Sequence, residues 1–560
     1  MEPYSFDVLW LVILSFLVSF VLAFGIGAND VANSFGTSVG SKVLSVRAAC
    51  WLATIFEVAG ALLIGYKVSD TMRKGILQVS MYEGNEKELM IGLHASLAGS
   101  AIWLIVATFF KLPISGTHSI VGATVGFSLV CRGSSGISWV TLSTIVLSWF
   151  ISPVLSGTVS VILFVGIRHF ILQSPSPMVP GLRSLPIFYG ITITINAFSV
   201  FHDGPKLLYF DKIPTWTGVL ISVLIGSVVA LVVQIFLVPY QRKLILEERN
   251  TRKPDVQFTF DYSTDSSREQ SPRLSRIEEG EIISTSVPEK QVDIEPSQLY
   301  LFSKPDPVNK NNGYILAETE HVQFNHETSP TESIAKLPIN SSTQLSLPTN
   351  GTTTPAFGLS PNSSAVPLIK DKPIHPLTIE TQTTVIQEEP PEVFRIFAFL
   401  QVLTATFGSF AHGGNDVSNA IGPLVAVWLI YTEGTVAQKS ETPIQILLFG
   451  GIGISLGLWL WGKRVIQTVG EDLTKITAST GFTIEVGSAL TVLLASKIGL
   501  PISTTHCKVG SVVFVGWVSS SSSGVDWKLF RNIISAWVVT VPVAAALSAL
   551  FTFILRIIVL

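Results

Sequence analysis

The chain has 560 residues, of which 48% are hydrophobic and only 13% are charged, and its formal net charge is −3. Soluble globular proteins carry about a quarter charged residues, so this composition excludes an ordinary soluble enzyme, and we expect no nucleic-acid partner. Repeated apolar runs of about twenty residues are long enough to cross a lipid bilayer, which predicts an all-α polytopic membrane protein.

Seven apolar runs in the first half are each expected to span the membrane. They lie near residues 6–27, 48–66, 90–110, 113–131, 140–167, 186–201 and 217–238. Five more lie near 393–412, 443–462, 479–497, 501–518 and 533–558. The sequence thus predicts about twelve transmembrane segments. Cys50, Cys131 and Cys507 lie in or beside these runs and are expected to be small buried hydrophobic residues.

Residues 241–391 have a different composition, rich in Ser, Thr, Pro, Glu and Asn, with no spanning apolar run. Such a segment cannot bury enough apolar surface to fold. We interpret it as a disordered loop between a first membrane half, 1–240, and a second, 392–560. Basic residues in the short loops favour a cytoplasmic position for this long loop and an extracellular position for both termini.

Two polar motifs each occur twice in the chain. Residues 27–33 read GANDVAN and residues 413–419 read GGNDVSN, while residues 112–118 read LPISGTH and residues 500–506 read LPISTTH. Asp30 precedes Pro113 by 83 residues, and Asp416 precedes Pro501 by 85. The same order and nearly the same separation indicate a duplicated unit. An odd number of predicted crossings separates the copies, which favours the inverted repeats of secondary transporters.

The LPIS motif predicts a broken or re-entrant helix. Pro113 and Pro501 cannot continue a preceding helix, and the hydroxyl residues that follow are suited to cap a new one. The free N–H groups of such a helix end attract anions. Two opposed ends with their hydroxyls would cradle a small oxyanion. For a single copy the simpler interpretation is a kink, with hydroxyls bonded back to the helix.

The Asn-Asp motif places a carboxylate and amide groups at membrane depth, where ionisable groups are costly and usually functional. Asn29, Asp30 and their counterparts Asn415 and Asp416 offer hard oxygen ligands that suit a small cation such as sodium. A cation bound beside an anion lowers the electrostatic cost of loading both. The structural alternative is that each Asp caps a nearby helix.

Two further acids and two histidines lie inside apolar runs. Glu57 and Glu485 could each be a cation ligand, a proton acceptor or a structural partner of a nearby hydroxyl. His118 and His506 end the two LPIS motifs, and their duplication makes them possible site residues. Three other histidines have no duplicated setting and were given no role: His94, His202 and His412.

Together the duplicated motifs resemble the inorganic phosphate transporter (PiT) family, in particular its eukaryotic sodium-dependent members. The resemblance covers residues 1–240 and 392–560 and implies sodium-coupled phosphate import, inverted repeats, a homodimer and a plasma-membrane location. We expect sodium at Asn29, Asp30, Glu57, Asn415, Asp416 and Glu485. We expect phosphate at Asn33, Ser115, Gly116, Thr117, Asn419, Ser503, Thr504 and Thr505.

The residues alone predict a cation-coupled oxyanion carrier. Proton coupling, and sulfate or another oxyanion as substrate, stay open at that level. A membrane receptor or sensor with vestigial transport is an alternative from a different class, whereas an ion channel has no need of two mirrored helix breaks. The sequence has no P-loop, no GxSxG motif and no Cys/His metal spacing. We therefore expect no enzyme activity and no cofactor, and the resemblance implies sodium as the coupling ion.

Overall fold

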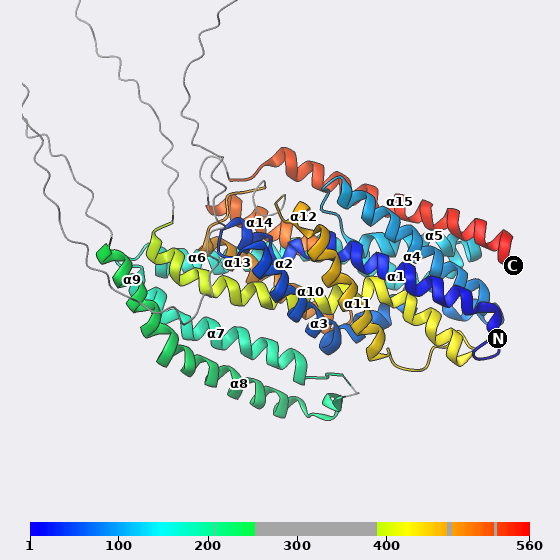
Figure 1. Cartoon of the computed structure of the whole chain (residues 1–560), viewed down its shortest axis with the longest axis horizontal. Helices are drawn as coiled ribbons and strands as arrows, with labels where there is room; N and C mark the ends of the chain where they lie inside the picture. Colours follow the sequence, from blue (N-terminus) through cyan, green and yellow to red (C-terminus); the bar gives the residue numbers. More distant parts are fainter. Residues whose placement is uncertain (206–207, 252–388, 468–472, 520–523) are drawn as a thin grey trace, which may run out of the picture. The chain divides into compact units, whose positions relative to one another are not determined.

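The computed structural model describes residues 1–205, 208–251, 389–467, 473–519 and 524–560. Within these ranges the chain forms helices and their connections, with one isolated β-bridge between Leu77 and Ile137 (Figure 1). Ten of the described helices are long and apolar enough to cross a membrane. This confirms an all-α polytopic membrane protein. Most of the predicted loop, 252–388, lies outside the described residues.

The helices of the first half follow the predicted apolar runs. In order they are α1 (Leu9–Asn29), α2 (Ala32–Gly40), α3 (Val46–Asp70), α4 (Glu86–Phe109), α5 (Gly116–Arg132), α6 (Trp139–Ile167), α7 (Met178–Phe201), α8 (Thr215–Val232) and α9 (Val238–Thr251). Helix α9 extends eleven residues beyond the predicted boundary at 240. Inside a bilayer a helix satisfies every backbone hydrogen bond within its own segment, which is why apolar runs fold this way.

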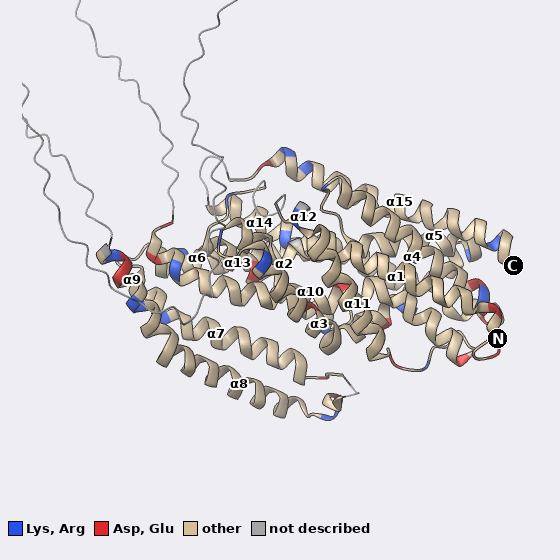
Figure 2. Cartoon of the chain, in the orientation of Figure 1, with Lys and Arg blue, Asp and Glu red and all other residues tan. Residues whose placement is uncertain are grey.

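The second half begins with the longest helix, α10 (Pro391–Glu433). It continues with α11 (Ile444–Gly457), α12 (Lys463–Gln467), α13 (Ala478–Lys497), α14 (Thr504–Ser519) and α15 (Trp527–Val559). Charged residues gather at helix ends and connections, with a few along the middle of the helices (Figure 2). The few interior charges are the ones that need a functional or structural explanation.

Helices α4 and α5 form a hairpin that leaves and returns on the same side. Arg132 at the end of α5 is 2.6 Å from the Glu88 carboxylate at the start of α4. Further in, the Ser100 hydroxyl donates to Ser119 at 2.8 Å. The predicted spans 90–110 and 113–131 are therefore the two arms of one helical hairpin. Helix α4 is long and apolar enough to cross a membrane, and separate crossings by the two arms stay a prediction.

Helices α13 and α14 form a second hairpin of the same kind. The Asp526 backbone N–H, just after α14, donates to the Leu473 carbonyl, just before α13, at 3.0 Å. Thr474 and Gly524 are joined by a second hydrogen bond between the same two connections. The predicted separate spans 479–497 and 501–518 are thus the two halves of one hairpin.

The two hairpins point in opposite directions. Helices α1 and α10 are antiparallel, because Tyr4 bonds to Tyr431 and Ser19 bonds to Ala420. Helix α4 runs parallel to α1, with Asn29 bonded to Thr108 and the earlier Ser15 paired with the earlier His94. Helix α13 runs parallel to α10, with Thr404 bonded to Glu485 and Asn415 bonded to Ser496. Each hairpin therefore follows the direction of its own Asn-Asp helix.

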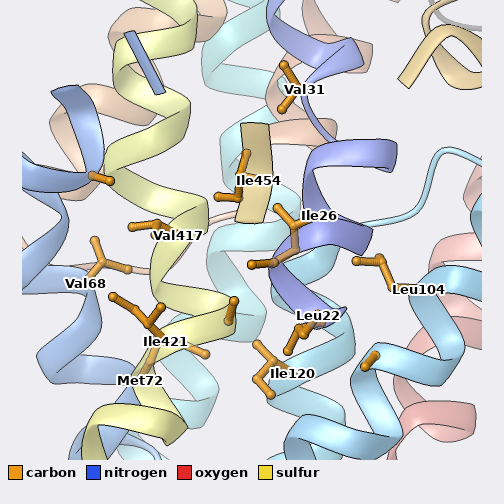
Figure 3. Packing of buried hydrophobic residues seen from close by; sticks show 14 of the residues in the cluster. Leu22, Ile26, Val31, Val68, Met72, Leu104, Ile120, Val417, Ile421 and Ile454 are labelled. Atoms are coloured by element: carbon orange, nitrogen blue, oxygen red, sulfur yellow. The ribbon is translucent and has the colours of Figure 1, made fainter. Parts of the chain in front are cut away.

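A hydrophobic cluster packs around the Asn-Asp motifs. It brings together Leu22 and Ile26 of α1, Val417 and Ile421 of α10, and Ile454 of α11 (Figure 3). Because lipid tails are as apolar as these side chains, close packing rather than removal from water stabilises the contact. Gly27 and Gly413 permit it, since a Cβ atom there would overlap the backbone of Ile454 and Glu57, respectively.

Candidate functional site

The first asparagine of each Asn-Asp motif is hydrogen-bonded to the hairpin of its own half. Asn29 Nδ2 donates to Thr108 Oγ1 and to the Leu112 carbonyl, both at 2.9 Å, and Asn29 Oδ1 accepts the Ile114 N–H at 3.1 Å. Asn415 Nδ2 donates to Ser496 Oγ at 3.0 Å and to the Leu500 carbonyl at 3.5 Å. The motif and the hairpin tip are therefore held at one depth in both halves.

The backbone differs between the two copies. Helix α1 ends at Asn29, and α2 begins at Ala32, so Asp30 and Val31 lie at a break. Helix α10 runs through Asn415 and Asp416 without interruption. The same motif thus occurs once at a helix break and once inside a continuous helix.

The second asparagines bond across to the hairpin of the other half. Asn33 Nδ2 donates to Thr505 Oγ1 at 2.9 Å, and Asn419 Nδ2 donates to Thr117 Oγ1 at 3.1 Å. The hairpin tips also contact each other, because Thr117 donates to the Ile502 carbonyl at 3.0 Å. These contacts unite two motifs and two hairpins in one buried group. We call it the central polar cluster: Asn29, Asp30, Asn33, Thr117, Asn415, Asp416, Asn419, Thr504 and Thr505.

Both carboxylates of the central polar cluster accept hydrogen bonds from hairpin residues. Asp30 Oδ2 accepts the Gly116 N–H at 3.1 Å, at the start of α5. Asp416 Oδ2 accepts the Thr504 hydroxyl at 2.5 Å, and its Oδ1 accepts from Asn419 Nδ2 at 3.1 Å. The Gly116 N–H, which we expected to face an oxyanion, therefore donates to Asp30 instead. This is the contact that the helix-capping alternative predicts.

The serines of the LPIS motifs are the N-caps of the returning helices. Ser115 Oγ accepts the His118 N–H at 3.3 Å, and Ser503 Oγ accepts the His506 N–H at 3.1 Å. This is the capping geometry predicted from the motif. It leaves the threonines, rather than the serines, as the hydroxyls that join the two halves.

Three buried amide oxygens in the central polar cluster have no hydrogen-bond partner among the described residues. They are Asn33 Oδ1, Asn415 Oδ1 and Asn419 Oδ1. A buried acceptor left unsatisfied costs about 1–3 kcal/mol, so such groups call for a ligand or water. Together with the carboxylates of Asp30 and Asp416, they form a set of hard oxygen atoms that suits a small cation.

His412 links Glu57 to the central polar cluster. Its Nδ1 lies 2.7 Å from Glu57 Oε2, and its Nε2 lies 2.8 Å from Asp416 Oδ2. Ser409 donates to the other Glu57 oxygen at 2.9 Å. No role for His412 is predicted from the sequence, because it has no counterpart beside the first Asn-Asp motif. Its spacing of four residues from Asp416 on one helix was the available signal.

Glu485 lies in a separate polar group. Thr37 and Ser38 of α2 each donate to its Oε1 at 2.6 Å, and Thr404 of α10 donates to its Oε2 at 2.6 Å. The buried Lys508 ammonium of α14 donates to Thr37 at 3.4 Å. We call these five residues the Glu485 group. Thr37, Thr404 and Lys508 come from segments that only the fold brings together, so the sequence pattern does not predict this group.

His118 and His506 pack against tryptophan rather than against the carboxylates. The His118 ring centroid is 3.8 Å from that of Trp149, and His506 is 3.8 Å from Trp537. The two histidine rings are 4.4 Å apart. They lie in the first turns of α5 and α14, next to Thr117 and Thr505, but their rings line a cavity formed by α6, α14 and α15, apart from the central polar cluster.

Comparison with known proteins gives one consistent result. A model of the phosphate transporter family matches residues 26–548. Sodium-dependent phosphate transporter 1-A of Danio rerio is 43% identical, over 97% of this chain and 94% of the relative. Sodium-dependent phosphate transporter 1 of Homo sapiens is 41% identical, over 99% and 97%. A solved structure described as the sodium-dependent phosphate transporter superposes with a TM-score of 0.68 at 30% identity, covering 98% of this chain and all of that one.

Proposed function

The chain belongs to the phosphate transporter family, and from that premise we propose how its duplicated motifs carry out transport. It is a sodium-coupled importer of inorganic phosphate and not an enzyme. The observation that carries the proposed site is the set of two carboxylates and three unpartnered amide oxygens where both hairpin tips meet.

Sodium is held in this proposal by the oxygen-rich side of the central polar cluster. Asp30 and Asp416 supply the charge, and Asn29 and Asn415 fix the hairpin tips beside them. Glu57 adds a third carboxylate through His412. Glu485 is proposed as a further sodium ligand, because the oxygens of Thr37, Ser38 and Thr404 already converge on it.

Phosphate is held in this proposal by the hydroxyl and N–H groups of the hairpin tips. Thr117 and Thr505 now bond to Ile502 and Ile114 carbonyls of the opposite tip, and these bonds would be exchanged for bonds to phosphate oxygens. The amide groups of Asn33 and Asn419 point at the same two hydroxyls. The further proposed contacts are with Ser115, Gly116, Ser503 and Thr504.

Coupling follows from the charges. Buried carboxylates repel an oxyanion, so phosphate can load only when cations neutralise them. A cation about 4 Å from a phosphate oxygen contributes about 4 kcal/mol at an effective dielectric constant of about 20. That is close to a thousandfold in affinity. Sodium bound at Asp30 and Asp416 would therefore decide whether phosphate binds.

We propose that the two halves are inverted repeats and that transport proceeds by alternating access. The hairpins enter from opposite directions and meet tip to tip at the central polar cluster. Withdrawing one hairpin opens the cluster to one side, and withdrawing the other opens it to the opposite side. We also propose a plasma-membrane homodimer with both termini outside and the long loop 241–391 in the cytoplasm. Native mass measurement in detergent tests the dimer: a species of 60.6 kDa alone would contradict it.

The deciding experiment for the site is radiolabelled phosphate uptake with sodium present or replaced by choline. We expect uptake to require sodium, and Asp30→Asn and Asp416→Asn each to abolish it at normal surface abundance. Asp211→Asn, at an exposed position outside the spans, is the matched control and should transport normally. Normal sodium-dependent uptake by both cluster variants would place the site elsewhere.

A further inference from the structure

A cavity of about 590 Å³ lies between α6, α14 and α15, beside the hairpin tips but apart from the central polar cluster. Its walls are almost entirely apolar, with Pro153 of α6 and Pro542 of α15 on two of them. One end is formed by His118, His506 and the Trp149 and Trp537 rings. This size and lining are typical of small-molecule sites, which combine an apolar body with a few polar groups.

The mouth of the cavity faces the position of the bilayer. Phe150 of α6 is 70% exposed and Val538 of α15 is 68% exposed, and both line the cavity. Both helices are largely exposed: only a third of the spanning window of α6 and 22% of that of α15 is buried. A molecule dissolved in the hydrocarbon layer therefore reaches this cavity directly.

The closed end of the cavity presents buried polar atoms without partners among the described residues. They are both ring nitrogens of His118, the Nε2 atom of His506 and the Nε1 atom of Trp149. His118 is 3% exposed and His506 is 5% exposed. In contrast, Trp537 Nε1 donates to the Pro113 carbonyl at 3.1 Å, and His506 Nδ1 is 3.0 Å from the Trp149 carbonyl. Native proteins rarely leave several such atoms unsatisfied side by side.

We propose that this cavity binds a membrane lipid with a neutral hydroxyl head group. A hydroxyl can donate to an imidazole nitrogen and accept from the Trp149 N–H, which matches the unpartnered atoms at the closed end. A charged head group does not fit, because the cavity lining contains no Lys, Arg, Asp or Glu, and burying an unpaired charge is costly. Sterols and diacylglycerols share this chemistry.

The bound lipid would regulate transport through the hairpins. His118 and His506 follow Thr117 and Thr505 directly in the chain, so a ligand that holds the two rings also holds the tips that carry those threonines. Occupancy lowers the maximal uptake rate without changing the KM for phosphate. This effect on rate rests on the proposed function, whereas the binding itself does not.

The test is photolabelling of the full chain in lipid nanodiscs, without sodium or phosphate. One arm uses a photoreactive sterol and the other a photoreactive diacylglycerol, each paired with its O-methyl ether. We expect saturable labelling of cavity residues by at least one hydroxyl probe, with about tenfold weaker labelling by its ether, since the ether cannot donate to a buried acceptor. The labelled arm identifies the lipid. Absence of saturable cavity labelling in both arms overturns the proposal.

Variants distinguish the site from general lipid contact. Trp149→Phe keeps the ring but removes the N–H, and it should reduce the preference for hydroxyl over ether. Val538→Trp and Val154→Trp each place a large side chain at the mouth and should abolish labelling. Two variants are used so that the test remains valid if one of them fails to fold. Val140→Trp, on α6 and 82% exposed outside the cavity, should label normally. Equal labelling by hydroxyl and ether probes overturns the proposal, whether or not the chain transports phosphate.

Discussion

The Thr505 hydroxyl, at the tip of the second hairpin, lies 3.2 Å from Asp30 Oδ1 in the first half of the chain. The same hydroxyl accepts from Asn33 and is 3.2 Å from the Ile114 carbonyl. One side chain thus contacts both the Asn-Asp motif and the hairpin of the opposite half. The central polar cluster is completed across the halves rather than within them.

Thr505→Val keeps the shape of this side chain and removes its hydroxyl. We expect at least a tenfold rise in the KM for phosphate, because a proposed phosphate donor is lost and Asn33 and Asp30 lose a partner. Thr144→Val is the matched control, since the Thr144 hydroxyl bonds only to a carbonyl of its own helix at an exposed position. Phosphate uptake at saturating sodium measures the effect. An unchanged KM would remove Thr505 from the phosphate site.

Gly116→Ala tests the close approach of α5 to Asp30. An added Cβ atom would lie 2.8 Å from Asp30 Oδ2, which is closer than real side chains allow. We expect uptake to fall below a tenth of the parent value while the protein still reaches the surface. Gly166→Ala in α6 makes the same chemical change where no atom lies within 4 Å, and it should transport normally. Equal uptake by the two variants would contradict the tight contact.

His412→Gln tests the link between Glu57 and Asp416. Without the imidazole the two buried carboxylates lose the group that lies between them, so we expect a several-fold rise in the sodium concentration for half-maximal uptake. The KM for phosphate at saturating sodium should change less. His94→Gln is the control, because His94 is also buried but pairs with Ser15 outside the cluster. A shift confined to the phosphate KM would argue against a role in sodium binding.

Glu485→Gln separates a sodium ligand from a structural acceptor. Glutamine keeps one acceptor oxygen for Thr37 and Ser38 but removes the charge. If Glu485 binds sodium, the sodium concentration for half-maximal uptake should rise about tenfold while the melting temperature stays normal. A structural role predicts the reverse: a lower melting temperature and an unchanged sodium response. Glu83→Gln, at an exposed position, provides the control for loss of a carboxylate.

Cysteine labelling tests the proposed orientation. Ser80 precedes α4 on the side of the N-terminus, and Ser176 lies between α6 and α7 on the opposite side, with both exposed. In intact cells an impermeant maleimide should label Ser80→Cys and should label Ser176→Cys only after permeabilisation. The unsubstituted chain, whose cysteines are buried or half-buried, sets the background. The opposite pattern would invert the topology.

The duplicated motifs were the part of this architecture most accessible to prediction. Asn29, Asp30 and their counterparts could be paired from sequence because both motifs recur at matched spacing, and the Ser115 and Ser503 caps follow from residue type. The break at each LPIS motif also follows from Pro113 and Pro501, whereas the packing of one hairpin tip against the other could not be predicted, because apolar composition does not record which segments meet. Nor does a shared motif fix backbone shape: Asp30 lies at a break and Asp416 in a continuous helix, since tertiary contacts override local preference.

Residues that occur once in the chain were the ones missed. His412 had no duplicated counterpart, and the partners of Glu485 come from α2, α10 and α14, which are far apart in sequence. Local pattern carries no information about such contacts. The two duplicated histidines of the LPIS motifs, His118 and His506, contact Trp149 and Trp537, and a site role for them stays a prediction.

The exchange of hydrogen bonds across the halves also constrains how such a protein could have arisen. A chain carrying only one Asn-Asp motif and one hairpin would leave Asn33 without Thr505 and Asp30 without its second donor. On the inverted-repeat arrangement that we propose, such a half-length ancestor would complete a site by pairing with a second copy inserted upside down in the same membrane. Before gene fusion, the pairing of the two copies would depend on two independent insertions in opposite orientations. A covalent connection that reverses direction would make this pairing permanent.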